Sequence, residues 1–216
     1  MAQGWLNVLL LVPIFLFSLS VHEFAHGWMA VKRGDNTPIL AGRLSLHPLA
    51  HADFIGTLAL PILCIYYGWP FFGWAKPVPI DVRNLKYGRR DMALVAAAGP
   101  ASNIILAILG TVLLAVLVRI ESGYKVLETV KLFTVVSMQV NLALAFFNLL
   151  PIPPLDGFNI FQVVLPGRFV AKLLKYAPAV NILLLVLLMS GGLGYLGRPI
   201  GFCFRWLINL AAGGVA

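Results

Sequence analysis

The chain alternates between long uncharged runs and short basic stretches. Because a transmembrane helix needs ~20 mostly apolar residues, the runs predict an all-α polytopic membrane protein with about five to six membrane segments. The apolar segments lie at about 5–33, 54–73, 92–118, 132–150, 176–196 and 200–213.

Composition strengthens this interpretation. Of the 216 residues, 60% are hydrophobic and only 11% are charged, which is typical of a chain that faces lipid. The net charge of +8 does not indicate a nucleic-acid partner, because the basic residues cluster between the apolar runs. Such clusters are retained on the cytoplasmic side of a membrane. We therefore expect the protein to lie in the lipid bilayer and to bind no nucleic acid.

Charge also predicts the topology. Lys32 and Arg33 place the end of the first segment in the cytoplasm. The basic stretch 74–91 should be cytoplasmic as well, so we expect segment 54–73 to be re-entrant, with bends at Pro61 and around Pro70. An ordinary spanning helix is the alternative. The remaining segments then bring Asp156 to the same leaflet as His26.

Candidate chemistry lies inside the first apolar run, in the pentapeptide His22-Glu23-Phe24-Ala25-His26. A carboxylate in hydrocarbon costs about 2.5–3.5 kcal/mol on insertion scales, so Glu23 needs a compensating partner. Two histidines four positions apart project from one face of a helix. They can bind one zinc ion, with Glu23 beside the attacking water as general base.

A catalytic zinc site usually has a third protein ligand, and Asp156 is the candidate. It follows an apolar segment and a rigid turn containing Pro151, Pro153 and Pro154, and Gly157 after it allows a close approach. Alternatively, Asp156 caps the helix that follows it.

A second polar cluster, His47, His51 and Asp53, offers a rival third ligand. It could also bind a second metal or cover the active site, although an interfacial loop with solvated polar groups is the simpler interpretation.

Two motifs together resemble the site-2 protease family of intramembrane zinc metalloproteases. The first is the pentapeptide, the second is Asn148-Leu149-Leu150-Pro151-Ile152-Pro153-Pro154-Leu155-Asp156-Gly157, and the stretch Ala98-Gly99-Pro100-Ala101-Ser102-Asn103 is also similar. The resemblance covers residues 22–157 and points to the small branch that lacks PDZ and CBS domains. It implies zinc ligation by His22, His26 and Asp156, catalysis by Glu23, and substrate binding by Asn148.

Further expectations concern structure. We expect one domain over 1–216, with a catalytic core of about 5–165 and a peripheral helical hairpin of about 172–216. The stretches 43–46 and 77–80 should pair as a small β element near the active site, whose edge could hold an unwound substrate. For Asn103 and Asn141 we favour structural hydrogen bonds.

The sequence thus predicts an intramembrane zinc endopeptidase in the cell membrane of a prokaryote, with its active site toward the cytoplasm. It would hydrolyse peptide bonds in or next to transmembrane segments of single-span membrane proteins, by Glu-assisted attack of zinc-bound water. The alternatives are a non-proteolytic membrane scaffold and a metal or ion transporter that uses the same residues. The oligomeric state is left open.

Overall fold

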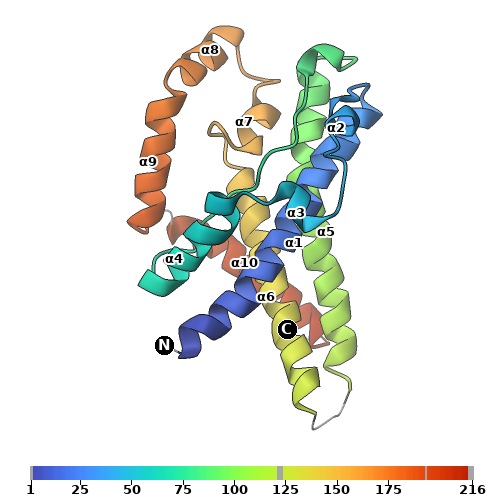
Figure 1. The fold of residues 1–216 in the computed structure, drawn as a ribbon, viewed down its shortest axis with the longest axis vertical. Helices are drawn as coiled ribbons and strands as arrows, with labels where there is room; N and C mark the ends of the chain where they lie inside the picture. The colour runs from blue at the N-terminus through green and yellow to red at the C-terminus, as the bar shows by residue number, and fades with distance from the viewer. Residues whose placement is uncertain (1, 121–123, 193, 214–216) are drawn as a thin grey trace.

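Three long apolar helices form the frame of the molecule. The computed structural model describes residues 2–120, 124–192 and 194–213, and within them every regular element is a helix. The long helices are α1 (Ala2–Lys32), α5 (Arg89–Leu117) and α6 (Lys125–Asn148) (Figure 1). At 1.5 Å per residue each exceeds the ~30 Å of a hydrocarbon core.

Shorter helices connect and flank this frame. They are α2 (Thr37–Leu40), α3 (Pro48–His51), the π-helix η1 (Phe54–Ala59), α4 (Leu60–Tyr67), η2 (Val82–Asn84), α7 (Asp156–Phe161), α8 (Gly167–Lys175), α9 (Ala177–Met189), η3 (Gly194–Leu196) and α10 (Gly197–Ala211).

Fewer of the described helices are long enough to span a membrane than the sequence pattern predicts. By length and composition, three described helices could cross a membrane, or four if the pair α8 and α9, bent by 66°, counts as one span. The expected five to six spans are not confirmed. The difference arises because 54–73, 176–196 and 200–213 form helices of fewer than eighteen residues, and such lengths fall short of a bilayer.

Segment 54–73 runs out past α1 and turns back, so that the chain on its two sides lies together. The six residues of η1 and the eight of α4 rise only about 21 Å. Gly68, with φ +68°, ends α4 in the left-handed conformation that glycine tolerates. The returning chain is hydrogen-bonded to the outgoing one, through Trp74 N to Gly56 O (3.0 Å) and Lys76 N to His51 O (2.9 Å).

The core lies where α5, α6 and α10 meet. Its buried side chains interlock at close range, and a Cβ added to Gly110 would lie only 2.6 Å from Met138 Cγ. Helices in lipid associate by such packing, because lipid tails are as apolar as the side chains. The cluster consists of Ala107, Leu114, Met138, Leu142, Leu207 and Ala211.

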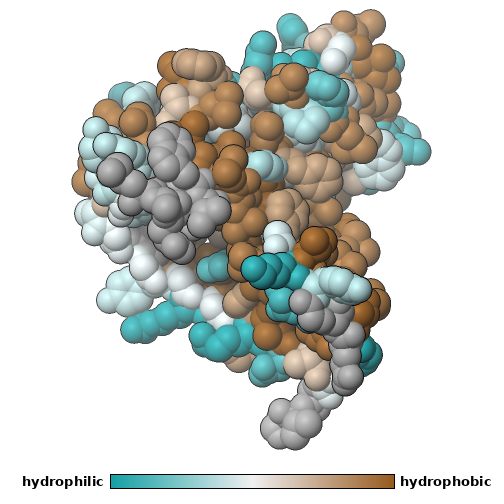
Figure 2. Space-filling view, turned by 60° about the horizontal axis from the view of Figure 1, so that its bottom comes forward, coloured by the Kyte–Doolittle hydropathy of each residue, from teal (hydrophilic) through white to brown (hydrophobic). Residues whose placement is uncertain are grey.

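Much of the outer surface is apolar, as an integral membrane protein requires. Figure 2 shows broad hydrophobic areas interrupted by smaller hydrophilic groups. Leu109 and Val112, on the long helix α5, are more than half exposed. The expected division into a catalytic core and a peripheral hairpin stays a prediction. Within that hairpin, α10 packs against α5 and α6, whereas α9 stands apart from them in Figure 1.

The expected small β element is not found among the described residues. Segments 43–46 and 77–80 are extended but form no ladder. Pro77 and Pro79 have no N–H to donate, and the N–H of Val78 goes to the Glu23 carboxylate (2.8 Å). The link between the two segments is a side chain, because the Arg43 guanidinium donates to the carbonyl oxygens of Lys76 (2.6 Å) and Pro77 (3.3 Å).

A buried aspartate fixes the far end of the returning chain. Asp35, fully buried, accepts hydrogen bonds from Thr37, from Asn84 and from the N–H of Asp81 (2.8 Å). Burial favours the neutral carboxyl, but these donors outweigh it and hold the pKa of Asp35 below its ordinary value. Residues 76–81 are therefore anchored at both ends, by His51 and by Asp35.

Candidate metal centre

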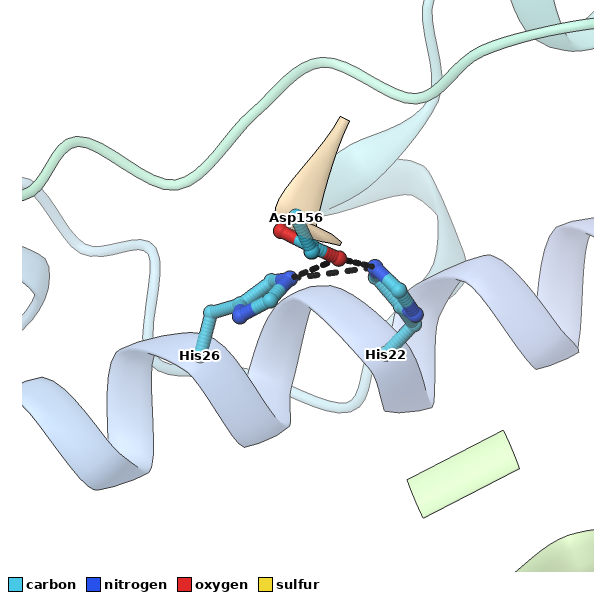
Figure 3. A group of neighbouring side chains, drawn as sticks. All are labelled: His22, His26 and Asp156. Carbon is cyan, nitrogen blue, oxygen red and sulfur yellow. Dashed lines mark hydrogen bonds and ion pairs between the residues drawn. The ribbon is translucent and has the colours of Figure 1, made fainter. Parts of the chain in front are cut away.

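Two imidazoles and one carboxylate converge on one side of α1 (Figure 3). His22 and His26 lie one helical turn apart, and their Nε2 atoms are 3.0 Å from each other. Oδ2 of Asp156 lies 3.1 Å from His22 Nε2 and 3.3 Å from His26 Nε2. Both histidines are buried, at 4% and 7% exposure. The structure thus brings Asp156 to the two histidines, although it lies 130 positions after His26 in the sequence.

The hydrogen bonds of the rings show which nitrogens are free. His22 Nδ1 lies 2.7 Å from Asn103 Oδ1, and His26 Nδ1 lies 2.8 Å from the carbonyl oxygen of Val95. Both partners are acceptors, so each Nδ1 is the donor. In the neutral rings the electron pairs therefore sit on the two Nε2 atoms, which point at each other and at Asp156.

Asp156 is presented by a tightly folded turn at the end of α6. It is the first residue of α7, and the N-cap position belongs to Leu155. A Cβ on Gly157 would overlap the backbone carbonyl of Leu149, so only glycine allows the turn to fold back this closely. The buried Oδ2 of Asp156 accepts no hydrogen bond from the described residues. This atom faces the imidazoles and does not cap the helix.

The donor set fits a divalent cation. The electron pairs of the two Nε2 atoms and of Asp156 Oδ2 face one another, and no hydrogen lies between them while both rings are neutral. A cation at this point satisfies all three at once. A tetrahedral ion with bonds of ~2.0 Å holds its ligands roughly 3.3 Å apart, close to the 3.0–3.3 Å found here. Two imidazoles and one carboxylate are typical zinc ligands. Within the described residues no other group of three such side chains comes together.

Glu23 is held beside this group by the returning chain. Its Oε2 accepts the hydrogen bond from Val78 N, and its side chain is half-buried. Glu23 and Asn148 line a cavity of about 200 Å³ together with the three donors. Asn148 is the last residue of α6, and its amide donates to the carbonyl of Leu144 (3.0 Å). All five residues predicted from the two motifs therefore face one space.

A much larger apolar cavity adjoins the site. It measures about 880 Å³ and is lined by α1, residues 71–75, α6, α9 and α10. His22, Glu23 and Asn148 form part of its polar lining. An apolar space with a few polar groups at one place is typical of a binding site.

The second polar cluster has a structural arrangement. His51 is fully buried, its Nε2 donates to the carbonyl of Ser45 (2.7 Å), and its own carbonyl accepts from Lys76 N. The Asp53 carboxylate caps η1 by accepting from Ile55 N and Gly56 N. His47 is exposed. These three residues do not converge on one point, and none of them joins His22 and His26.

Three contributions to the site escaped the sequence analysis. Asn103 makes the expected structural hydrogen bond, to Asn141, and in addition contacts His22 directly. The N–H of Val78 orients Glu23. A Cβ on Gly99 would overlap both imidazole rings, so the glycine makes room for them. The amide of Asn103 within a mostly apolar helix was the signal available for the first, whereas the other two depend on contacts between distant segments.

Comparison with known proteins gives consistent results. The family model of peptidase family M50 matches residues 117–190. The protein named "Putative zinc metalloprotease YwhC" from Bacillus subtilis is 39% identical over 200 residues, which are 91% of this chain and 84% of that protein. Two proteins named "Putative zinc metalloprotease Rip2" are also similar. The one from Mycolicibacterium smegmatis is 32% identical, over 71% of this chain and 56% of that protein. The one from Mycobacterium tuberculosis is 31% identical, over 91% of this chain and 72% of that protein. No solved structure matches the chain.

Proposed function

Since the chain belongs to peptidase family M50, the family of the site-2 proteases, we propose that it is an intramembrane zinc endopeptidase. It hydrolyses peptide bonds in or next to the transmembrane segments of single-span membrane proteins. The observation that carries this proposal is the convergence of His22, His26 and Asp156 within 4.8 Å of one another. The two histidines lie on α1, a helix apolar enough to cross a membrane.

The residues of the site have separate tasks. His22, His26 and Asp156 hold zinc, which supplies Lewis acidity that polarises the scissile carbonyl and acidifies water. Glu23 accepts the proton of the attacking water and returns it to the leaving amine. The hydrogen bond from Val78 N keeps the Glu23 carboxylate at this position. Asn148, which lines the same cavity as Glu23, binds the substrate backbone with its side-chain amide.

The large cavity is the place for the substrate. A helical substrate hides its carbonyls in backbone hydrogen bonds, so a short stretch must unwind before it reaches Glu23. The apolar lining of the 880 Å³ cavity accepts the side chains of that stretch. Residues 77–80 beside Glu23 can pair with that stretch chiefly through their carbonyl oxygens, because Pro77 and Pro79 have no N–H and Val78 N is bound to Glu23.

The site faces the cytoplasmic side of the membrane in this proposal. Lys32, at the end of α1, lies six residues beyond His26. Basic residues gather at the same end of α5, at Arg89 and Arg90, and in α8. Such clustering favours a cytoplasmic location. The helices η1 and α4 would then form a re-entrant segment, because the returning chain is hydrogen-bonded beside the outgoing one, through Trp74 N to Gly56 O.

The test compares wild type with Glu23→Gln after purification in detergent. Each protein is analysed for zinc and incubated with a panel of single-span substrates. We expect both to carry zinc, and we expect Glu23→Gln to cleave at least 100-fold more slowly, because general acid–base catalysis contributes about 10²–10⁴-fold. A wild type without zinc, or equal cleavage by both proteins, contradicts the proposal. If neither protein cleaved any substrate, and cells carrying Glu23→Gln behaved like cells carrying the wild type, the non-proteolytic scaffold would be favoured.

A further inference from the structure

We propose that Asn103 is a positioning residue that fixes the hydrogen of His22 on Nδ1 and so keeps His22 Nε2 free for the metal. This inference rests on the proposed zinc site. It assigns a role to a residue that makes no contact with the metal or the substrate. The orientation of Asn103 is in turn fixed by hydrogen bonds that link α5 to α6 and α1.

The direction of these hydrogen bonds follows from their far end. Asn141 Nδ2 donates to the backbone carbonyl of Ser137 (2.9 Å) and to Ser18 Oγ (3.0 Å). A carbonyl oxygen only accepts, so the Asn141 amide cannot be reversed. Its Oδ1 accepts from Asn103 Nδ2 (2.8 Å). The Oδ1 of Asn103 is therefore left facing His22 Nδ1, at 2.7 Å.

Burial keeps these hydrogen bonds from being exchanged for bonds to water. Ser18, Asn103 and Asn141 are each 0% exposed, which leaves no route for water to replace a partner. A buried ring N–H without an acceptor is costly, so the His22 hydrogen stays where Asn103 Oδ1 accepts it. If the hydrogen moved to Nε2, it would occupy the electron pair that the cation needs.

The two metal-binding rings differ in how they are held. His26 Nδ1 donates to a backbone carbonyl, that of Val95, which no side-chain substitution removes. His22 depends on a side chain, so its orientation can be tested by mutation. Outer partners of metal-ligating histidines typically contribute about 10–100-fold to metal affinity.

A purely structural role for Asn103 makes the opposite prediction for one pair of variants. If Asn103 only joined helices, Asn103→Leu would lower zinc affinity less than Asn103→Asp does. The reason is that Asn103→Asp buries a charge and sets a carboxylate oxygen against Asn141 Oδ1. If Asn103 positions His22, Asn103→Asp keeps the acceptor for Nδ1 and strengthens the ligand, whereas Asn103→Leu removes it.

The experiment measures zinc affinity by chelator competition for the full-length proteins in detergent. We expect Asn103→Leu to bind zinc about 10–100-fold more weakly, and Asn103→Asp to match or exceed the wild type. Thr111→Val is the matched control. Thr111 is another buried polar residue of α5, and its hydroxyl donates only to its own helix, at Ala107 O. This variant should bind zinc like the wild type.

Unchanged affinity in Asn103→Leu, or an equal loss in folded Asn103→Asp, overturns the inference while leaving the proposed function intact. Wild type without zinc affinity overturns both. If the variants do not fold, nitrogen NMR of ¹⁵N-histidine in the zinc-loaded wild type decides. A hydrogen on His22 Nδ1 that exchanges slowly supports the role of Asn103, and coordination through Nδ1 contradicts it.

Discussion

The molecule contains two groups of two histidines and one aspartate, and they differ in what their polar atoms contact. In the group of His22, His26 and Asp156, each histidine uses one nitrogen for a hydrogen bond and turns the other toward the aspartate. In the group of His47, His51 and Asp53, His51 Nε2 and the Asp53 carboxylate bond to the backbone and His47 is exposed. The buried His51 Nδ1 has no hydrogen-bond partner among the described residues, but no two further ligand atoms converge on it. Residue types alone do not distinguish a metal site from a structural cluster.

The difference teaches that a metal site needs several electron pairs that remain after hydrogen bonding and that converge on one point. Asp53 accepts from two backbone N–H groups, whereas the buried Oδ2 of Asp156 accepts none from the described residues. The structural group nevertheless supports the candidate metal site indirectly. His51 anchors the returning chain at Lys76, two residues before the Val78 N–H that holds Glu23.

The two groups should differ most in how the loss of one histidine affects zinc affinity. We expect His26→Ala to lower zinc affinity by more than about 100-fold, because losing a direct ligand must exceed the loss of an outer partner. Cleavage of a single-span substrate should fall with it. Zinc content after dialysis against a weak chelator checks this. Stoichiometric zinc in the variant would show that His26 is not a ligand.

Substitution in the structural group should affect stability and leave zinc in place. His51→Ala removes the buried donor to the Ser45 carbonyl and should destabilise the protein by about 1–3 kcal/mol. His47→Ala is the matched control, because His47 is exposed and such changes stay within about 0.5 kcal/mol. Denaturant unfolding in detergent and zinc analysis measure both quantities. Loss of zinc from folded His51→Ala would contradict the division between the groups.

The smallest expected effect is that of the helix cap. Asp53→Ala leaves Ile55 N and Gly56 N without their acceptor and should cost about 0.5–2 kcal/mol. Asp53→Asn retains a capping oxygen and should cost less. The same unfolding measurements rank the two variants, and equal losses would mean that capping is not what Asp53 contributes.

Much of the frame could be predicted from the sequence. Helices α1 and α5 match the apolar runs 5–33 and 92–118 to within three residues, because a long uncharged run in a membrane has few alternatives to a helix. Helix α6 contains most of the run 132–150 but begins seven residues earlier, at Lys125. The helical spacing of His22 and His26 placed them on one face. The partnership with Asp156 came from charge topology together with the resemblance to a family, since spacing says nothing about a residue 130 positions away.

The rest depended on contacts between distant segments. The extended stretch 77–80 resembled a strand, but its two prolines and the Glu23 carboxylate removed the donors that a ladder requires. Asn103 was recognisable as a buried amide in an apolar helix, yet its partner on α1 was not. Side-chain direction across a helix interface is set by packing, which a single sequence does not encode locally.

The most direct test of the central claim is X-ray absorption at the zinc edge of the purified wild-type protein. We predict one zinc ion per chain, with two imidazole nitrogens and oxygen donors at roughly 2.0–2.2 Å and no sulfur. Replacing Asp156 by Ala should remove one oxygen scatterer or the metal itself. A spectrum dominated by sulfur near 2.3 Å, or an unchanged spectrum for Asp156→Ala, would contradict the account.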